Sequence, residues 1–186
     1  GNTNTGYVRA AFEFLQVDAI TVHPYLGAEA LQPFLNCTNK GIIVLCRTSN
    51  PGAGEFQDIK VNLFATEQIS GEVPFYQYVA YRVERYWNKN GNCAVVVGAT
   101  YPEELREVRR IVGDMPILIP GVGFQQKDVP LEKQVEQVVS AGKDSRGQGM
   151  IINSSRGIIF ASKGADFAES ARRETEKLSN LINQYR

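Results

Sequence analysis

The sequence predicts an α/β fold built on a parallel β-sheet. Short runs of apolar, mostly β-branched residues alternate with amphipathic helical segments along the chain, and glycine or proline marks many of the boundaries. Strands that are separated by helices form right-handed βαβ units, in which the strands run in the same direction. No linker or low-complexity segment interrupts residues 1–186, so we expect a single domain.

The chain begins with a predicted helix. Asn4 or Thr5 is placed to cap this helix at its start. Its predicted apolar face consists of Tyr7, Val8, Ala11, Phe12 and Leu15. Five short apolar runs follow and predict strands buried on both faces, at residues 17–22, 41–46, 93–98, 116–119 and 149–152.

Further amphipathic segments predict the helices between and after the later strands. A helix is expected over residues 75–88, because large side chains recur there at a spacing of three or four. Its inward face would be Phe75, Tyr76, Val79, Val83 and Tyr86. Pro102 and Pro130 open two more helices, which Gly113 and Gly142 close. The last helix is expected over about residues 165–185.

Two features limit the choice of architecture. Residues 47–74 show no clear helical or strand pattern, and connections of this length are functional or contain small elements of their own. The chain also supplies only five predicted strands. Five parallel strands suit an open doubly wound sheet, whereas a (β/α)8 barrel needs about eight. The alternatives are therefore an open sheet, or a barrel whose first three strands are absent from this chain.

Composition narrows the classes of partner. Twenty basic residues balance twenty acidic ones, without a run of like charge, which argues against a nucleic acid or an anionic membrane as the main partner. A small anion needs only one or two arginines. No apolar stretch approaches the roughly 18 residues of a membrane span, and the first residues lack a signal-peptide pattern. The three scattered cysteines predict free thiols in a reducing compartment, so we expect a cytoplasmic protein.

Two loops after consecutive strands predict a phosphate site. Gly121 and Gly123 follow the fourth predicted strand and allow main-chain N–H groups to approach an oxyanion. Arg156 follows the fifth strand and offers a planar pair of donors that matches two phosphate oxygens. After the second strand, Thr48 and Ser49 are placed to present polar groups to a heterocycle at the mouth of the long loop.

Other kinds of chemistry find little support in the sequence. His23 is the single histidine and has no Ser or Asp at a spacing that suggests a catalytic triad, so a structural role is expected for it. No group of Cys, His and Asp has the spacing of metal ligands, and no metal is predicted.

Four segments together resemble the orotidine 5'-phosphate decarboxylase family: residues 18–27, 44–54, 119–125 and 152–158. The match is closest to the bacterial branch with an Arg-Thr-Ser-Asn-Pro-Gly-Ala segment, which stands here at residues 47–53. The resemblance implies a (β/α)8 TIM barrel that forms a homodimer, of which this chain supplies strands 4–8 and their helices. It implies decarboxylation of orotidine 5'-monophosphate to uridine 5'-monophosphate, a step of de novo pyrimidine biosynthesis that uses neither a metal nor an organic cofactor.

The resemblance also implies roles for individual substrate-binding residues. Ser49 matches the serine that hydrogen-bonds the pyrimidine ring. Gln125 matches the glutamine that bridges the pyrimidine O2 region and the phosphate, and Arg156 matches the arginine that clamps the phosphate. Gly123 and Ser155 are expected to add main-chain contacts near that phosphate.

Two more implications concern neighbouring parts of the enzyme. Thr3 matches a threonine that reaches a ribose hydroxyl in the site of the other subunit. The family's alternating Lys/Asp array, which acts at C6 of the substrate, precedes the Gly-Asn-Thr at which this sequence starts. We therefore expect no catalytic residue within the chain, an array located upstream of Gly1, and an inactive fragment when the chain is alone.

Three other interpretations remain open from the sequence. The chain is a non-catalytic module that binds nucleotide or dimerises, or it belongs to a sugar-phosphate aldolase or epimerase on a related barrel. The third is an unrelated open-sheet nucleotide-binding domain of the flavodoxin type, which suits five strands but leaves the agreement of four segments unexplained.

Overall fold

A computed structural model describes residues 2–63, 71–123 and 128–186 of the chain. It contains one five-stranded parallel sheet, with strand order β1-β2-β5-β6-β7, and a separate two-stranded sheet. The strands of the main sheet are β1 (Ala19–Val22), β2 (Gly41–Arg47), β5 (Cys93–Val97), β6 (Ile117–Pro120) and β7 (Met150–Asn153). The expected α/β class is confirmed, and each of the five apolar runs coincides with a strand to within two residues.

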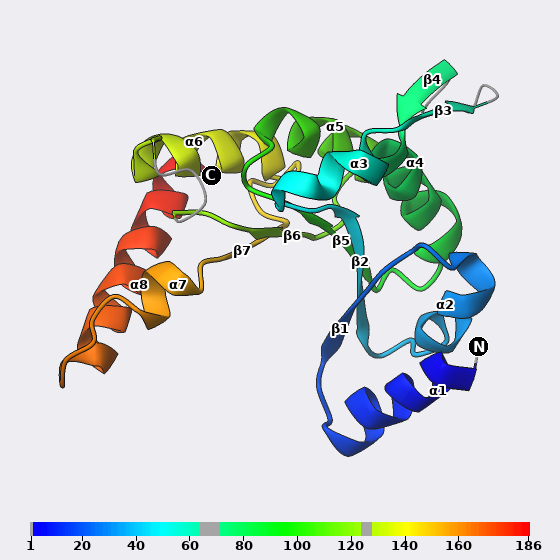
Figure 1. Cartoon of the computed structure of the whole chain (residues 1–186), viewed down its shortest axis with the longest axis horizontal. Helices are drawn as coiled ribbons and strands as arrows, with labels where there is room; N and C mark the ends of the chain where they lie inside the picture. Colours follow the sequence, from blue (N-terminus) through cyan, green and yellow to red (C-terminus); the bar gives the residue numbers. More distant parts are fainter. Residues whose placement is uncertain (1, 64–70, 124–127) are drawn as a thin grey trace.

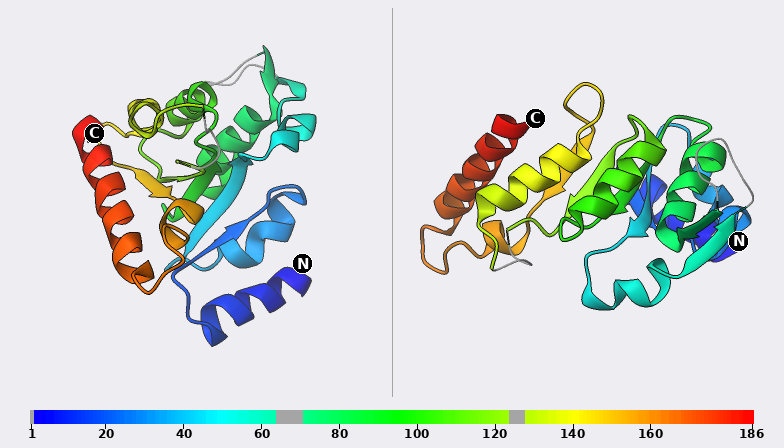
Figure 2. Two further views of the ribbon diagram at one scale, coloured as in Figure 1. Left: turned by 60° about the vertical axis from the view of Figure 1, so that its left-hand side comes forward. Right: turned by 90° about the horizontal axis from the view of Figure 1, so that it is seen from above.

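Helices surround the outside of this curved sheet. They are α1 (Asn2–Val8), α2 (Gly27–Leu35), α4 (Phe75–Arg82), α5 (Pro102–Val112), α6 (Leu131–Gly142), α7 (Arg156–Ile159) and α8 (Phe167–Tyr185). Figures 1 and 2 show α6, α5, α4 and α2 following one another around the sheet, with α8 beside β7 and α1 beside α2. None of the helices among the described residues is long and apolar enough to cross a membrane.

The two faces of the main sheet differ in burial. Along β2, Ile42 and Val44 are fully buried on the face that the helices cover, whereas Ile43 and Leu45 on the other face are only partly buried. The same alternation occurs in β6, where Ile117 is fully buried. The core therefore lies between the sheet and the outer helices, and burial of these β-branched side chains stabilises the layer by roughly 1.5–3 kcal/mol each.

The first helix differs from its prediction. The helix begins at Asn2, and Asn4 does not cap it, because the Asn4 side-chain amide donates a hydrogen bond of 2.6 Å to the main-chain oxygen of Ala30 in α2. A π-helical segment, η1 (Arg9–Phe14), continues α1. The additional residue in its turn shifts the helical phase, and Tyr7 and Leu15 are consequently 59% and 64% exposed instead of buried.

A second π-helical segment, η3 (Val83–Trp87), divides the helix that was expected over residues 75–88. Its wide turn is closed by the N–H of Asn88, which donates to the main-chain oxygen of Val83 at 2.8 Å. The shift in phase turns Trp87 inward, where it is 7% exposed, and leaves Tyr86 44% exposed. The prediction that Tyr86 faces the core was therefore wrong, because it assumed 3.6 residues per turn throughout.

The long segment after β2 contains small elements, as expected. They are a 3-10 turn η2 (Pro51–Ala53), a short helix α3 (Gly54–Gln57), and an antiparallel hairpin of β3 (Lys60–Leu63) and β4 (Gly71–Pro74). Helix α2 was not predicted from the sequence. It contains Pro33, which lacks an N–H and ordinarily argues against a helix.

Arg109 ties together the main chain at the end of the sheet where strands β6 and β7 begin. Its guanidinium donates five hydrogen bonds of 2.5–2.9 Å. The acceptors are the main-chain oxygens of Gly113, Met115, Gly142 and Gly149. One side chain therefore joins the end of α5, the end of α6 and the entries to both strands.

The turn between α6 and β7 is organised around Asp144. Its side chain is fully buried and accepts hydrogen bonds from the N–H groups of Arg146 and Gln148, at 2.9 and 2.7 Å. The Arg146 guanidinium adds an ion pair of 2.9 Å. Burial of the carboxyl opposes its ionisation, but these donors outweigh burial and lower the pKa of Asp144 to about 2.

Candidate functional site

The loops that follow the strands gather at one edge of the sheet, because the carboxyl ends of parallel strands point the same way. Main-chain contacts connect these loops in sequence across the sheet. The N–H of Gly98, after β5, donates to the oxygen of Arg47 in β2 at 2.7 Å, and the N–H of Ala99 donates to Pro120 in β6 at 2.9 Å. Pro120 in turn pairs with Asn153 in β7. This edge is where α/β proteins bind their ligands.

The loop after β6 has the backbone geometry of a tight glycine turn. Gly121 and Gly123 have φ angles of 104° and 88°, which residues with a side chain rarely adopt. Gln134 of α6, which is 4% exposed, accepts a hydrogen bond of 2.9 Å from the Gly123 N–H and donates one of 2.6 Å to the oxygen of Val129. No pattern in the sequence points to this role for Gln134. A phosphate contact from the Gly123 N–H would have to replace the Gln134 bond.

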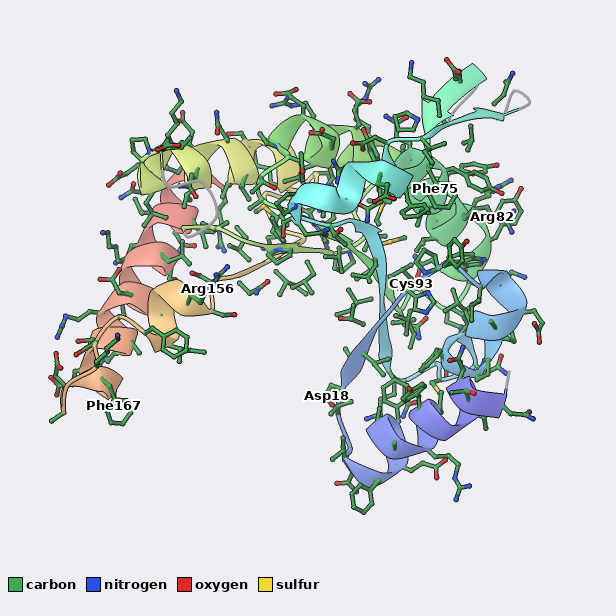
Figure 3. All side chains as sticks on the ribbon, in the orientation of Figure 1. Asp18, Phe75, Arg82, Cys93, Arg156 and Phe167 are labelled. Atoms are coloured by element: carbon green, nitrogen blue, oxygen red, sulfur yellow. The ribbon has the colours of Figure 1, made fainter. Side chains whose placement is uncertain are left out.

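The loop after β7 lies directly beside this turn. A Cβ atom built on Gly123 would lie 3.9 Å from the Ser154 hydroxyl. Ser155 and Arg156 come next in the chain, and both are exposed. Figure 3 places Arg156 where β7 passes into α7, on the rim of the sheet. The structure thus places the loop that carries Arg156 beside the glycine turn.

The loop after β2 is fixed by a very close approach of the main chain. A Cβ atom on Gly98 would lie 2.6 Å from the Cβ atom of Ser49 and 2.9 Å from its nitrogen, which is too close for any residue except glycine. Ser49 therefore rests against the carboxyl end of β5. It shares the edge with Arg156, and β5 and β6 separate the two strands that carry them. At about 4.8 Å per strand, β2 and β7 are roughly 14 Å apart along the sheet.

Arg47, at the end of β2, supports the loop that contains Ser49. The side chain is 2% exposed, and its guanidinium carbon lies 3.9 Å from the centre of the Tyr101 ring, an arrangement that favours a cation–π contact. It donates to the Thr48 oxygen at 3.2 Å and forms an ion pair of 3.1 Å with Asp58 of the long loop. In the sequence, Arg47 is recognisable only as part of the Arg-Thr-Ser-Asn-Pro-Gly-Ala segment. The one local feature that could have indicated its supporting role is a charged residue at the end of an apolar strand.

Gln57 completes the support of this loop. Its side-chain oxygen accepts from the N–H of Thr48 at 2.9 Å and from Arg47 at 3.2 Å. Its amide nitrogen donates to the Thr48 hydroxyl at 2.9 Å, and that hydroxyl donates to Asn50 at 2.7 Å. Thr48 and Asn50, the residues on both sides of Ser49, are therefore both held by hydrogen bonds.

A cavity of about 320 Å³ opens beside this loop, between the end of β2 and α3. Thr48, Gln57 and the exposed side chain of His23 are among the residues that line it. The histidine is therefore on the rim of the sheet and not in the core. Cys46 also borders the cavity, but burial raises the pKa of its thiol to about 12, so it is not a nucleophile at neutral pH.

Gln125 and Thr3 are the two remaining residues of the predicted site. Gln125 lies outside the described residues. Thr3 is exposed on α1, and Figure 1 shows α1 on the opposite side of the molecule from α7. The chain by itself does not bring Thr3 to the phosphate loops. Among the described residues, no cluster of three or more His, Cys, Asp or Glu side chains is arranged to hold a metal ion.

Comparison with known proteins relates the chain to one family. The model of the family described as "Orotidine 5'-phosphate decarboxylase / HUMPS family" matches residues 1–171. The orotidine 5'-phosphate decarboxylase of Ralstonia nicotianae is 47% identical over 186 residues, which are 100% of this chain and 63% of that protein. The chain therefore spans less than two thirds of the length of this relative.

Solved structures show the same relationship. The OMP decarboxylase of Leishmania donovani superimposes with a TM-score of 0.79 at 34% identity, covering 98% of this chain and 64% of that one. The UMP synthase of the same organism has a TM-score of 0.78 at 36% identity, covering 97% and 36%. The five parallel strands and their helices thus have the fold of TIM-barrel proteins, which excludes the open flavodoxin-type sheet. The chain belongs to the orotidine 5'-phosphate decarboxylase / HUMPS family.

Proposed function

We propose that this chain carries the nucleotide-binding part of an orotidine 5'-phosphate decarboxylase, a carboxy-lyase of pyrimidine biosynthesis. The observation that carries the proposal is the adjacency of the two loops after β6 and β7. Pro120 pairs with Asn153, and the turn at Gly123 approaches Ser154, so the loop that carries Arg156 lies beside the glycine turn on the rim. We propose that a phosphate there is bound by the planar guanidinium of Arg156 and by main-chain N–H groups of the turn, whose two glycines carry no side chain.

The remaining parts of the nucleotide are assigned by their distance from this phosphate. Ser49 stands three strand positions away on the same edge, roughly 14 Å along the sheet and less where the sheet curves. We assign the pyrimidine ring to the Ser49 end and the ribose to the interval between the loops. Gly123, Gln125 and Ser155 are proposed to complete the phosphate contacts.

In the proposed reaction, the bond between C6 of orotidine 5'-monophosphate and its carboxylate breaks. Carbon dioxide leaves, the electron pair stays on C6, and a proton then adds to that carbon to give uridine 5'-monophosphate. We propose that the charged residues acting at C6 belong to the Lys/Asp array that the resemblance places ahead of Gly1. The role of this chain is to bind the distant phosphate and ribose, because binding energy from non-reacting groups lowers the barrier at the reacting carbon.

We further propose a cytoplasmic homodimer as the working form. Its support is the chemistry of the chain. The described cysteines, Cys37, Cys46 and Cys93, are free thiols, as suits a reducing compartment. Thr3 is exposed on α1, a position from which it would contact a second subunit and not its own phosphate loops.

Arg156→Ala in the whole enzyme tests the proposal. It is expected to lower kcat/KM by orders of magnitude, equivalent to roughly 3–5 kcal/mol of transition-state binding, since a charge-assisted pair with the phosphate is lost. Arg172→Ala is the matched control, because Arg172 is an exposed arginine paired with Glu176 on the surface of α8. Equal kcat/KM in the two variants would remove Arg156 from the phosphate site.

Ligand binding by the 186-residue chain separates the remaining interpretations. A binding module would retain affinity for uridine 5'-monophosphate and release no carbon dioxide from orotidine 5'-monophosphate. A sugar-phosphate aldolase or epimerase would bind ribose 5-phosphate as tightly as the pyrimidine nucleotide, because its site would have no contact for the base. A clear preference for the nucleotide, together with turnover by the whole protein, is the outcome expected for the decarboxylase.

A further inference from the structure

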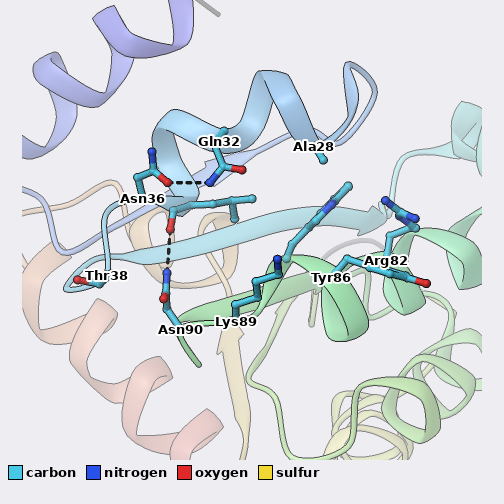
Figure 4. Close-up of a pocket in the computed structure, with 10 residues that line it drawn as sticks. Ala28, Gln32, Asn36, Thr38, Arg82, Tyr86, Lys89 and Asn90 are labelled. Atoms are coloured by element: carbon cyan, nitrogen blue, oxygen red, sulfur yellow. Dashed lines mark hydrogen bonds between the residues drawn. The ribbon is translucent and has the colours of Figure 1, made fainter.

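We propose that the groove between α2 and η3 is a second ligand site, which binds a small anion bearing a phosphate group. The groove encloses about 490 Å³, which lies within the range of roughly 300–1,000 Å³ found for small-molecule sites. Figure 4 shows Gln32 on α2 and Asn36 just after it on one side of the groove, with Arg82, Tyr86 and Lys89 on the other.

The groove is separate from the candidate decarboxylase site. Asn36 and Thr38 lie in the segment that leads into β2, and Lys89 and Asn90 lie in the segment that leads into β5. These segments are at the amino ends of the strands, on the edge of the sheet opposite to Ser49 and the phosphate loops. A ligand in the groove would therefore not compete directly with a nucleotide at the other edge.

The charge of the groove favours an anion. Of the described residues that line it, Arg82 and Lys89 are charged, and no carboxylate is among them. Neither cation forms an ion pair with a carboxylate within the described parts of the chain, so a ligand would not have to displace one. The Arg82 guanidinium lies 4.2 Å from the centre of the Tyr86 ring, which orients its donors.

Neutral donors surround these two cations. The Asn90 amide is held by a hydrogen bond of 2.9 Å to the Leu35 oxygen, and Gln32 donates to Asn36 at 2.7 Å. Thr38 adds a hydroxyl at the mouth of the groove. A lysine point charge, an arginine with paired donors and nearby amides are the usual components of a phosphate site.

One residue that lines the groove carries an unsatisfied donor. Trp87 lines the groove and is 7% exposed, and its indole N–H is buried without a hydrogen-bond partner among the described residues. Buried donors of this kind are rare and call for a missing partner. The π-helical turn of η3 brings Trp87 to this position, and such turns are frequent at functional sites.

The indole N–H resonance of Trp87 offers a direct test, because the sequence contains a single tryptophan. In a ¹⁵N–¹H correlation spectrum of the chain, inorganic phosphate is expected to shift this resonance saturably, while sodium chloride at equal ionic strength does not. Trp87→Phe confirms the assignment of the signal. The same titration is repeated with uridine 5'-monophosphate and with uridine, which lacks the phosphate. Tighter binding of the nucleotide than of phosphate identifies a nucleotide as the ligand, and equal affinity identifies free phosphate.

Variants distinguish a built site from a general effect of charge. Arg82→Gln and Lys89→Gln are each expected to weaken phosphate binding about tenfold, whereas Arg85→Gln, an exposed arginine of η3 that does not line the groove, stays within about twofold. Arg156→Ala is expected to leave the Trp87 shift unchanged, since it acts at the other edge. The proposal is overturned if phosphate causes no saturable shift, if chloride reproduces it, or if all three glutamine variants weaken it equally.

Discussion

Replacement of Arg47 by methionine tests the link between the core and the Ser49 loop. Methionine fills a similar apolar volume at the end of β2 but removes the guanidinium. The variant loses the hydrogen bond to the Thr48 oxygen, one of the contacts of Gln57, the ion pair with Asp58 and the contact with the Tyr101 ring. Three of these contacts are made with Thr48, Gln57 and Asp58 of the segment that follows β2, so the effect should concentrate there.

The magnitude follows from the burial of each partner. Asp58 is 48% exposed, so water screens its ion pair, which contributes at most about 1 kcal/mol. The ring contact and the two partly buried hydrogen bonds contribute roughly 1–2 kcal/mol each. The Nε atom of Arg47 is buried without a partner among the described residues, and that desolvation offsets part of the gain. The expected net loss is about 3 kcal/mol, or roughly 6–12 °C in Tm for a domain of this size.

Thermal and urea unfolding measure this loss, with Arg106→Met, a substitution at an exposed residue of α5, as the control that should change stability by less than about 0.5 kcal/mol. A double-mutant cycle with Tyr101→Leu should give a coupling energy of about 1 kcal/mol, because the two side chains are in contact. If Arg47→Met melted within 1 °C of the parent, or showed no coupling to Tyr101, the proposed support of the loop by Arg47 would be incorrect.

Three further outcomes follow from the geometry. Arg109→Met leaves four main-chain oxygens without their donor and should cost roughly 3 kcal/mol by urea unfolding, with Arg109→Lys recovering only a minor part. Gly98→Ala places a methyl group 2.6 Å from Ser49 and should cost about 1–3 kcal/mol while weakening nucleotide binding; unchanged binding would show that the Ser49 loop moves freely. Because the folded-state pKa of Asp144 is lowered to about 2, its stabilising contribution is complete above the unfolded pKa near 4 and is lost as the pH falls toward 2; Asp144→Asn should flatten the stability–pH curve in this window.

The sequence predicted the positions of the strands well because they are short and apolar, and these properties are local. The expectation that all five are buried on both faces was wrong: β5 is buried along its whole length, whereas β7 has no buried residue. Val95 and Ile117 are fully buried, as the pattern of their segments indicated. The phases of two helices were predicted poorly. No pattern in the residues around Tyr86 or Leu15 predicts a π-helical turn. The additional residue of such a turn is accommodated by packing against neighbouring elements, which a local pattern does not contain.

The candidate site was predictable in part for a similar reason. The glycine turn at Gly121 and Gly123 and the arginine after β7 are local signals at the ends of apolar runs, and parallel strands bring them to one edge. Arg47 and Gln134 act through contacts with residues 11 positions away in the chain, Asp58 and Gly123. Such partners depend on the tertiary fold, and a pattern within one segment does not contain them.

The hydrogen bonds of Arg109 determine how the turns around it tolerate substitution. All its acceptors are carbonyl groups of the backbone, which every amino acid possesses. Substitutions in these turns therefore keep the hydrogen bonds of Arg109 intact as long as the path of the main chain is preserved. Only Arg109, the donor, is irreplaceable. The side chains around these four carbonyl groups should accordingly vary freely among related proteins, whereas Arg109 itself should hardly vary.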